Sequence, residues 1–177
     1  MSMGALTERH LVLFGTIVQS FARHEVVMQE IMAHASGADV ASIKFLTAHL
    51  SLAEKRDVLF NLLRHRAVPL DQIEQIQNWL QMLSTFTALY MDITHSIWME
   101  GRPQNSIWPV WLSHGPSAAV KPLHGIAENG KEFIEDDRDK LTYTLGDLEE
   151  ISRNLENNYI SFQEYAVAIG LGTSYGR

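Results

Sequence analysis

The chain has 177 residues, 46% of them hydrophobic and 20% charged, which suits one folded domain and argues against a disordered segment. It contains no cysteine, which excludes disulfides, thiolate zinc sites and thiol nucleophiles and is consistent with a reducing compartment. The formal net charge of −7 disfavours an extended nucleic-acid-binding surface, so no DNA partner is expected.

The sequence also argues against a membrane protein. No stretch reaches 18 consecutive apolar residues. The apolar run from Leu11 to Val18 is interrupted by Gly15 and Thr16, and it lacks a basic region and a cleavage site. We therefore expect no membrane span and no targeting signal, and a cytoplasmic location.

The first part of the chain is predicted to form three helices. An amphipathic pattern predicts a helix from about residue 6 to 35, ended by Gly37, and a second helix at about 39–50. Ser51 and Glu54 have the spacing of a capping box, which predicts a third helix that runs to about His65. Pro69 follows as a helix breaker.

Two more helices are predicted further along the chain. The fourth runs from about Asp71 to Met99, and its wide apolar face includes Ile76, Trp79, Leu80, Leu83, Phe86, Tyr90, Ile93 and Trp98. The last begins at Thr144, with Asp147 at its third position, and runs to about Ile169.

Residues 102–143 break the helical pattern. Strands are expected at 107–112 and 118–120 around a turn at 114–117, with a third at 141–143, and Pro109 indicates an edge or bulged strand. The predicted fold is mainly α: a single domain over 1–177, an up-and-down helical bundle of four to five helices with a small β hairpin or sheet insertion before the last helix. A short tail is expected at about 171–177.

Glu25 is the most informative residue of the first helix. It shares an apolar stripe with Phe14, Val18, Phe21, Met28 and Met32. A carboxylate within such a stripe is costly unless it is paired, protonated or functional. Lys55 lies within the apolar stripe of the third helix, so a Glu25–Lys55 ion pair would solve the problem that each residue poses alone.

Asp92 and His95 flank the apolar face of the fourth helix. They lie three positions apart, so their side chains are adjacent on the helix surface, and Asp92 or a backbone carbonyl could fix the tautomer of His95. Together with Glu25 and Lys55 they form either an architectural polar network that sets helix register or a functional site.

Known catalytic and cofactor motifs are absent from the sequence. No glutamate has a histidine three positions later, and Met28 stands where the second zincin histidine would be, so no metal is expected. There is no glycine-rich phosphate loop and no nucleophile elbow, so no cofactor is expected. Trp108 and Trp111 beside Arg102 are either a base-stacking platform or, as the acidic balance favours, aromatics that pack the sheet onto the helices.

The order of several segments resembles the bacterial HEPN-like helical proteins. The segments are Leu13-Phe14-Gly15-Thr16-Ile17-Val18 with Phe21 and Glu25, Leu50-Ser51 with Lys55, Thr94-His95-Ser96-Ile97-Trp98, and Tyr143-Thr144-Leu145-Gly146-Asp147-Leu148. The resemblance implies a helical bundle that forms a homodimer and, for some members, metal-independent ribonuclease activity.

The ribonuclease motif of that family is Arg, four to six residues, then His, commonly with Asn or another polar residue after the Arg. If His95 is the family histidine, Tyr90 and Met91 stand in the places of Arg and Asn, and no arginine lies five to seven positions before any histidine. Phosphodiester cleavage needs a base and a cation for the developing phosphorane charge. His95 could be the base, with Lys55 or Arg102 in place of the missing arginine.

The sequence therefore predicts a HEPN-like binding or interaction module without a complete catalytic motif, forming a homodimer. One alternative is a divergent ribonuclease that uses His95, oriented by Asp92, with RNA as substrate. Another is a small-ligand pocket between the first, third and fourth helices, anchored by Glu25 or Lys55. Tyr90 and Arg102 complete the candidate binding residues.

Overall fold

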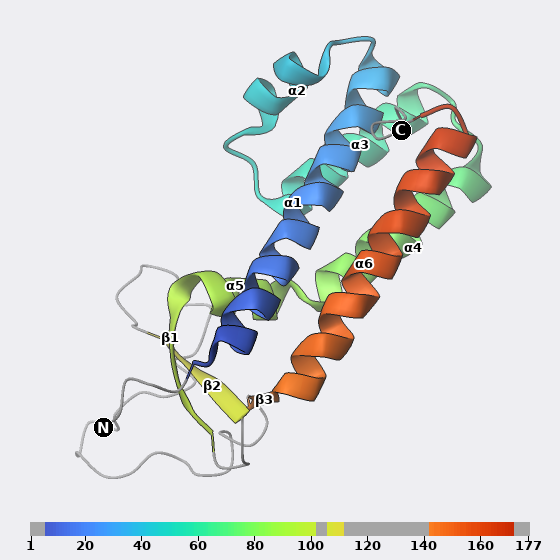
Figure 1. Ribbon diagram of the computed structural model, residues 1–177. Coiled ribbons are helices and arrows are strands. Elements are labelled where there is room, and N and C mark those ends of the chain that lie inside the picture. Colours follow the sequence, from blue (N-terminus) through green and yellow to red (C-terminus); the bar gives the residue numbers. More distant parts are fainter. Residues whose placement is uncertain (1–5, 102–105, 112–141, 172–177) are drawn as a thin grey trace, which may run out of the picture. The chain divides into compact units, whose positions relative to one another are not determined.

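The computed structural model describes residues 6–101, 106–111 and 142–171 (Figure 1). Within these ranges the elements in chain order are α1 Glu8–Ser36, α2 Val40–Thr47, α3 Leu52–His65, α4 Leu70–Thr85, α5 Thr87–His95, β1 Ser96–Glu100, β2 Ser106–Trp111, β3 Tyr143–Thr144 and α6 Leu145–Ala168. The predicted fold class, mainly α with a small antiparallel sheet before the last helix, is confirmed.

The chain divides into two compact units. The first unit comprises Met1–Val18 and Thr87–Arg153, and the second comprises Gln19–Phe86 and Asn154–Arg177. Both α1 and α6 therefore contribute residues to each unit. The predicted strand at 118–120, the turn at 114–117 and the tail beyond residue 171 lie outside the described residues.

Capping interactions explain where the first helices begin and end. The Asp39 side chain accepts a hydrogen bond from Ser42 N at 2.9 Å and caps α2. Ser51 and Glu54 form the predicted capping box at the start of α3, with Glu54 Oε2 accepting from Ser51 N at 2.7 Å. Gly37 follows α1 with φ 77°, a left-handed conformation that glycine adopts without strain.

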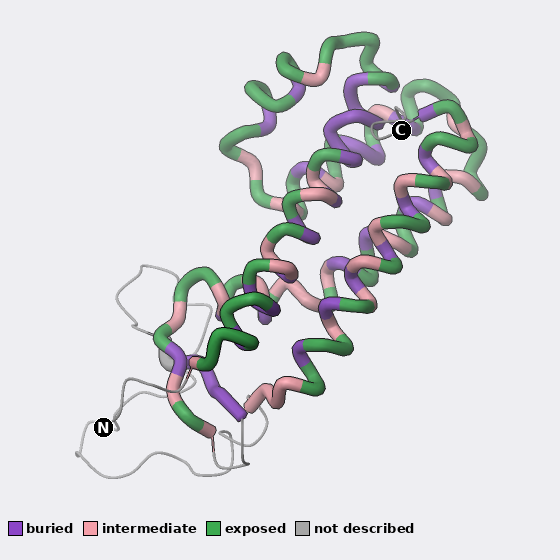
Figure 2. The backbone as a smooth tube through the Cα atoms, viewed as in Figure 1, coloured by how far each residue is buried: buried purple, intermediate pink, exposed green. Residues whose placement is uncertain are grey.

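The core of the second unit lies between α1, α3, α4 and α6. Figure 2 shows that α1 has many buried residues in this unit, whereas most residues of α2 are exposed. Burial of each large apolar side chain contributes roughly 1.5–3 kcal/mol, so this cluster holds the unit together. Its most deeply buried members are Met28, Ile31, Met32, Leu59, Leu63, Ile76 and Phe162.

The predicted fourth helix is interrupted at Phe86, and the prediction is wrong from Ser96 on. Its C-terminal part is a separate helix, α5, and the residues from Ser96 to Glu100 form strand β1. Phe86 separates the two helices, and its N–H donates to Leu83 O at 3.2 Å, a tighter turn than that of an α-helix. Ile97 and Trp98 favour strands, and pairing with β2 satisfies the β1 backbone.

The sheet is antiparallel, with strand order β1-β2-β3. β1 pairs with β2 along its whole length, with Trp98 opposite Pro109, whereas β3 pairs only with Ser106 and Ile107 of β2. β2 is therefore the central strand and not the edge strand that Pro109 indicated. Pro109 still lies where β2 has a described neighbour on one side only, which tolerates its missing N–H.

Gly101 follows β1 at a close approach of two chain segments. Its N–H donates to Ser106 O at 2.8 Å. A Cβ at this position would overlap Ser106 Oγ and would lie 2.9 Å from Thr142 Cγ2. Only glycine fits here without a shift of its neighbours.

The wide apolar face predicted for one helix is divided between the two units. In the first unit, the Trp98 ring lies 4.7 Å from Phe14 and 5.9 Å from Tyr143, centroid to centroid. In the second unit, Trp79 packs against Phe162 and Tyr165. These tryptophans therefore serve two local cores, one in each unit.

By length and composition, α1 is the one helix among the described residues that could cross a membrane. The same length and apolarity occur in helices that form a protein core, and 44% of the most apolar window of α1 is buried.

Candidate functional site: the cleft at Glu25 and Lys55

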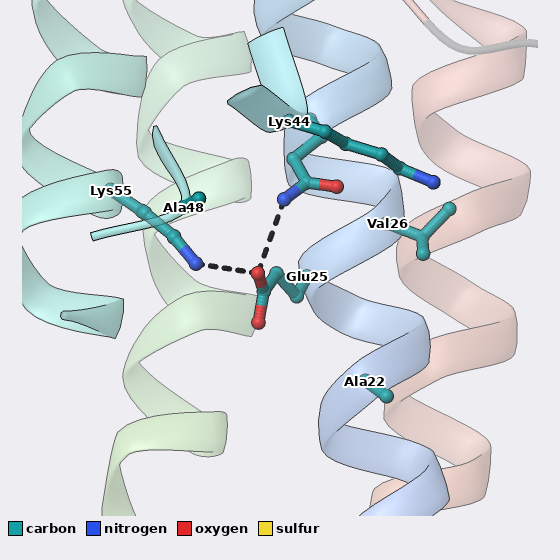
Figure 3. Close-up of a pocket in the computed structure, with 7 residues that line it drawn as sticks. Ala22, Glu25, Val26, Lys44, Ala48 and Lys55 are labelled. Atoms are coloured by element: carbon teal, nitrogen blue, oxygen red, sulfur yellow. Dashed lines mark hydrogen bonds and ion pairs between the residues drawn. The ribbon is translucent and has the colours of Figure 1, made fainter. Parts of the chain in front are cut away.

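Glu25 and Lys55 form the ion pair that the sequence suggested. Lys55 Nζ donates to Glu25 Oε1 at 2.5 Å, and Gln29 Nε2 donates to the same oxygen at 3.1 Å (Figure 3). Neither bond uses Glu25 Oε2, which no described donor reaches. The pair joins α1 to α3 within the second unit.

The two partners differ in burial, which corrects the expectation that Glu25 lies inside an apolar stripe. The Lys55 side chain is 7% exposed, whereas that of Glu25 is 39% exposed. The buried face of α1 in this unit is centred on His24, Met28 and Ile31. Glu25, one residue past His24, therefore lies about 100° from the centre of that face, at the edge of the core.

A cleft of about 450 Å³ opens beside this ion pair. It lies between α1, α2 and α3, all in the second unit, and we call it the Glu25 cleft. The predicted pocket thus has α2 in place of the fourth helix. The cleft is lined by Ala22, Glu25, Val26, Gln29, Lys44, Ala48 and Lys55.

The charges of the Glu25 cleft are mixed. Two ammonium groups, those of Lys44 and Lys55, and the Glu25 carboxylate leave one formal positive charge. Lys44 is exposed, and Figure 3 shows its ammonium turned away from the carboxylate. In the described part of the chain, no acceptor lies within hydrogen-bond distance of Lys44 Nζ.

The other predicted site residues lie outside this cleft. Asp92, His95 and Tyr90 belong to the first unit, so the predicted network of four polar residues is divided between the units. Asp92 is 7% exposed, whereas His95, the last residue of α5, is exposed and Tyr90 is half-buried. Arg102 and the side chain of Trp111 lie outside the described residues, and Trp108 is buried.

The Asp92 carboxylate acts on a residue that the sequence did not associate with it. Burial raises the pKa of the Tyr143 hydroxyl, and the nearby Asp92 charge raises it further. Tyr143 also contacts Trp98 by its ring. Asp92 is therefore part of the electrostatic environment of the sheet.

His24 is a buried polar residue that was not among the predicted site residues. Its Nδ1–H donates to Ser20 O at 2.7 Å, so Nε2 is the acceptor that faces Asn158 Nδ2 at 3.1 Å. Asn158 Nδ2 also donates to Trp79 O at 3.2 Å. The side chain is fully buried and neutral in this arrangement, because both ring nitrogens have the partners of a neutral imidazole.

Burial lowers the pKa of His24, although the hydrogen bond to Ser20 O and the Glu156 carboxylate both act to raise it. Arg23 Nη1 binds Glu156 at 2.9 Å beside this network. The network links α1, α4 and α6 and is architectural. The burial of His24 could have been predicted from its position on the helix, because it shares a face with Phe21 and Met28.

In the described residues, His, Asp and Glu side chains do not gather in a group of three or more that could hold a metal ion. A comparison of the chain with family models, with curated proteins and with solved structures finds no match. The resemblance to HEPN-like proteins therefore stays a prediction from the segments quoted above.

Proposed function

We propose that this protein is a HEPN-like binding module without a catalytic centre, and that it binds a small polar ligand in the Glu25 cleft. The cleft volume of about 450 Å³ lies within the roughly 300–1,000 Å³ typical of small-molecule sites. Small apolar side chains form part of its wall and a few polar groups converge in it, as in most ligand pockets.

The observation that carries the proposal is the state of Lys55. An ammonium can donate three hydrogen bonds, and within the described residues Lys55 Nζ has one acceptor, Glu25 Oε1. The Lys55 side chain is 7% exposed and lines the cleft, so a ligand in the cleft can reach its ammonium. A ligand that carries an anionic acceptor into the cleft would form charge-assisted hydrogen bonds with these donors.

A cleft-filling variant tests the proposal with charges left intact. Val26 lines the cleft and is 39% exposed, whereas Val167 on α6 is 40% exposed and is not among the lining residues. A library of small polar metabolites is screened by ligand-observed NMR against wild type, Val26→Trp and Val167→Trp. Hits should bind wild type and Val167→Trp but not Val26→Trp. Equal binding to both variants, or no hit at all, would contradict the proposed site.

A second candidate function, self-association, is supported by α2. Phe45 and Leu46 are 81% and 60% exposed on this short helix. Adjacent large apolar side chains exposed to this extent are typical of interaction surfaces. We propose that a second copy of the chain covers them, in line with the homodimer that the HEPN-like resemblance implies.

Sedimentation equilibrium tests self-association with matched leucines. Leu46→Ser should weaken the dimer, whereas Leu70→Ser, at a leucine of α4 that is 68% exposed, should not. A monomeric wild type at all accessible concentrations would rule out the homodimer.

A further inference from the structure

We propose that the ligand of the Glu25 cleft is a small zwitterion, an amino acid or a close analogue with one carboxylate and one ammonium group. This inference rests on the proposed function, because it names the chemical class that the cleft would bind. It follows from the positions of the unfilled donors and acceptors around the Glu25–Lys55 pair and from the apolar wall beside them.

The site for a cation is the free side of the Glu25 carboxylate. Both protein donors, Lys55 Nζ and Gln29 Nε2, bind Oε1. Oε2 belongs to a side chain that is 39% exposed and lines the cleft, so it can accept from a ligand. Gln29 uses its amide nitrogen on Glu25, which leaves its amide oxygen as a second acceptor. An ammonium with its three donors suits this pair of acceptors.

The site for an anion lies at Lys55. Its ammonium retains two donors that no described acceptor fills, and a ligand carboxylate can accept from them. Lys44 adds a second, exposed positive charge to the lining, although its ammonium is turned away from Glu25 (Figure 3). Because Lys55 is 7% exposed, a hydrogen bond to its charge is screened less than a surface contact would be.

A zwitterion meets both requirements at once. The protein pair has a positive end at Lys55 and a negative end at Glu25, joined by a 2.5 Å hydrogen bond. A ligand of opposite polarity laid along this pair brings its carboxylate to Lys55 and its ammonium to Glu25 Oε2. Each charge then has opposite charges as neighbours. A simple anion would leave Oε2 unfilled, and a simple cation would face the net positive charge of the lining.

The apolar wall sets the remaining part of the ligand. Ala22, Val26 and Ala48 present methyl groups to the cleft, and the volume of about 450 Å³ is towards the small end for a ligand site. An uncharged side chain of a few carbons fits this wall, whereas an added charge would be desolvated against it. Amino acids with uncharged side chains should therefore bind better than acidic or basic ones.

Isothermal titration calorimetry on the full chain tests the inference. The probes are the free L-amino acids with uncharged side chains and two half-ligands for leucine: 4-methylpentanoate, which lacks the ammonium, and 3-methylbutylamine, which lacks the carboxylate. At least one amino acid should bind, and leucine should bind about tenfold or more tighter than either half-ligand, because each half-ligand loses one set of charge-assisted hydrogen bonds.

Three variants assign the two ends of the ligand. Glu25→Gln should weaken the amino acid and 3-methylbutylamine but not 4-methylpentanoate. Lys44→Met, at an exposed residue, should weaken binding of the amino acid and of 4-methylpentanoate but not of the amine. Arg64→Met removes an exposed cation of α3 that is not among the lining residues. It should leave the affinities for the amino acid and for both half-ligands unchanged.

The outcomes also separate this inference from the proposed function. Equal affinity for leucine and 4-methylpentanoate would reduce the site to an anion site and overturn the zwitterion. No binding by any amino acid, combined with metabolite hits that Val26→Trp abolishes, would overturn the zwitterion and keep the cleft. Metabolite hits that Val26→Trp leaves unchanged would overturn both.

Discussion

Lys55 and Glu25 form an ion pair in which the cation is buried and the anion is not, with side-chain exposures of 7% and 39%. The ammonium therefore depends on the carboxylate for its charge compensation more than the carboxylate depends on the ammonium. Water can solvate a half-exposed Glu25 that has lost its partner, but a buried Lys55 without its partner is left in the protein interior.

This asymmetry predicts that the two ends of the pair contribute unequally to stability. Glu25→Ala should lower the free energy of unfolding by about 2–3 kcal/mol, below the 3–5 kcal/mol of a fully buried pair because the cleft admits water. Lys55→Met should cost about 0–1 kcal/mol, since the methionine packs in the same space. Urea denaturation of both variants measures the two values, and a larger cost for Lys55→Met would contradict the asymmetry.

A matched surface pair provides the control. The Glu149 side chain is 46% exposed, a fraction similar to the 39% of Glu25, but its partner Arg9 is 59% exposed. Glu149→Ala should therefore cost about 0–1 kcal/mol, the range of exposed ion pairs. A loss as large as that of Glu25→Ala would show that burial of the cation is not the cause.

The His24 network predicts a pH dependence of stability. Burial lowers the pKa of His24 below the value of 6.5 for the unfolded chain, so the unfolded state binds a proton first as the pH falls. The stability is therefore fully present above about pH 6.5 and declines as the pH falls from there through the pKa of the folded state. Denaturation midpoints between pH 8 and pH 5 measure the decline.

A glutamine at position 24 cannot titrate, so His24→Gln should be less stable than wild type at pH 8 but should lose less stability towards pH 5. His34→Gln, at an exposed histidine of the same helix, should retain the wild-type pH profile. A profile that His24→Gln leaves unchanged would assign the pH dependence to other groups.

Two glycines of the first unit should respond to alanine with opposite signs. Gly101→Ala places a Cβ against Ser106 and Thr142 and should cost about 1–3 kcal/mol, as overpacking does. Gly15 lies within α1 with no atom within 4 Å of the added Cβ, so Gly15→Ala should stabilise by about 0.5–1 kcal/mol. Thermal unfolding of both variants measures these changes. An unchanged stability of Gly101→Ala would refute the close approach of Ser106 and Thr142 to Gly101.

The chain should not cleave single-stranded RNA. His95 is exposed and accessible, but no arginine stands five to seven positions before it to stabilise the phosphorane charge. Incubation with a labelled single-stranded RNA should leave the substrate intact for wild type and His95→Ala alike. Cleavage that His95→Ala abolishes would establish the ribonuclease alternative.

The helices that local chemistry determines could be predicted from the sequence. Asp39, Ser51 and Gly37 act on their own helix ends through contacts a few residues away. The fourth helix was wrong because its last part, from Ser96 to Glu100, is decided by pairing with β2. A non-local ladder of backbone hydrogen bonds there outweighs a helical pattern of apolar residues.

Part of the candidate site could also be predicted from the sequence. Glu25 and Lys55 each stand out in the sequence as a charge among apolar neighbours, so their pairing could be inferred. The degree of burial of the two side chains could not be inferred, because it depends on which face of α1 packs into the core and on the position of α2. The His24–Asn158 contact joins residues 134 positions apart, and nothing in the local pattern of either residue indicates it.

The most direct test of the Glu25 cleft as the binding site is a backbone amide ¹H–¹⁵N spectrum recorded during titration of the tightest metabolite hit. Shift changes should be largest at lining residues of α1 and α3 and at the end of α2, including Ala22, Val26 and Ala48. Shift changes centred on α5 around His95, with the cleft amides unmoved, would contradict it.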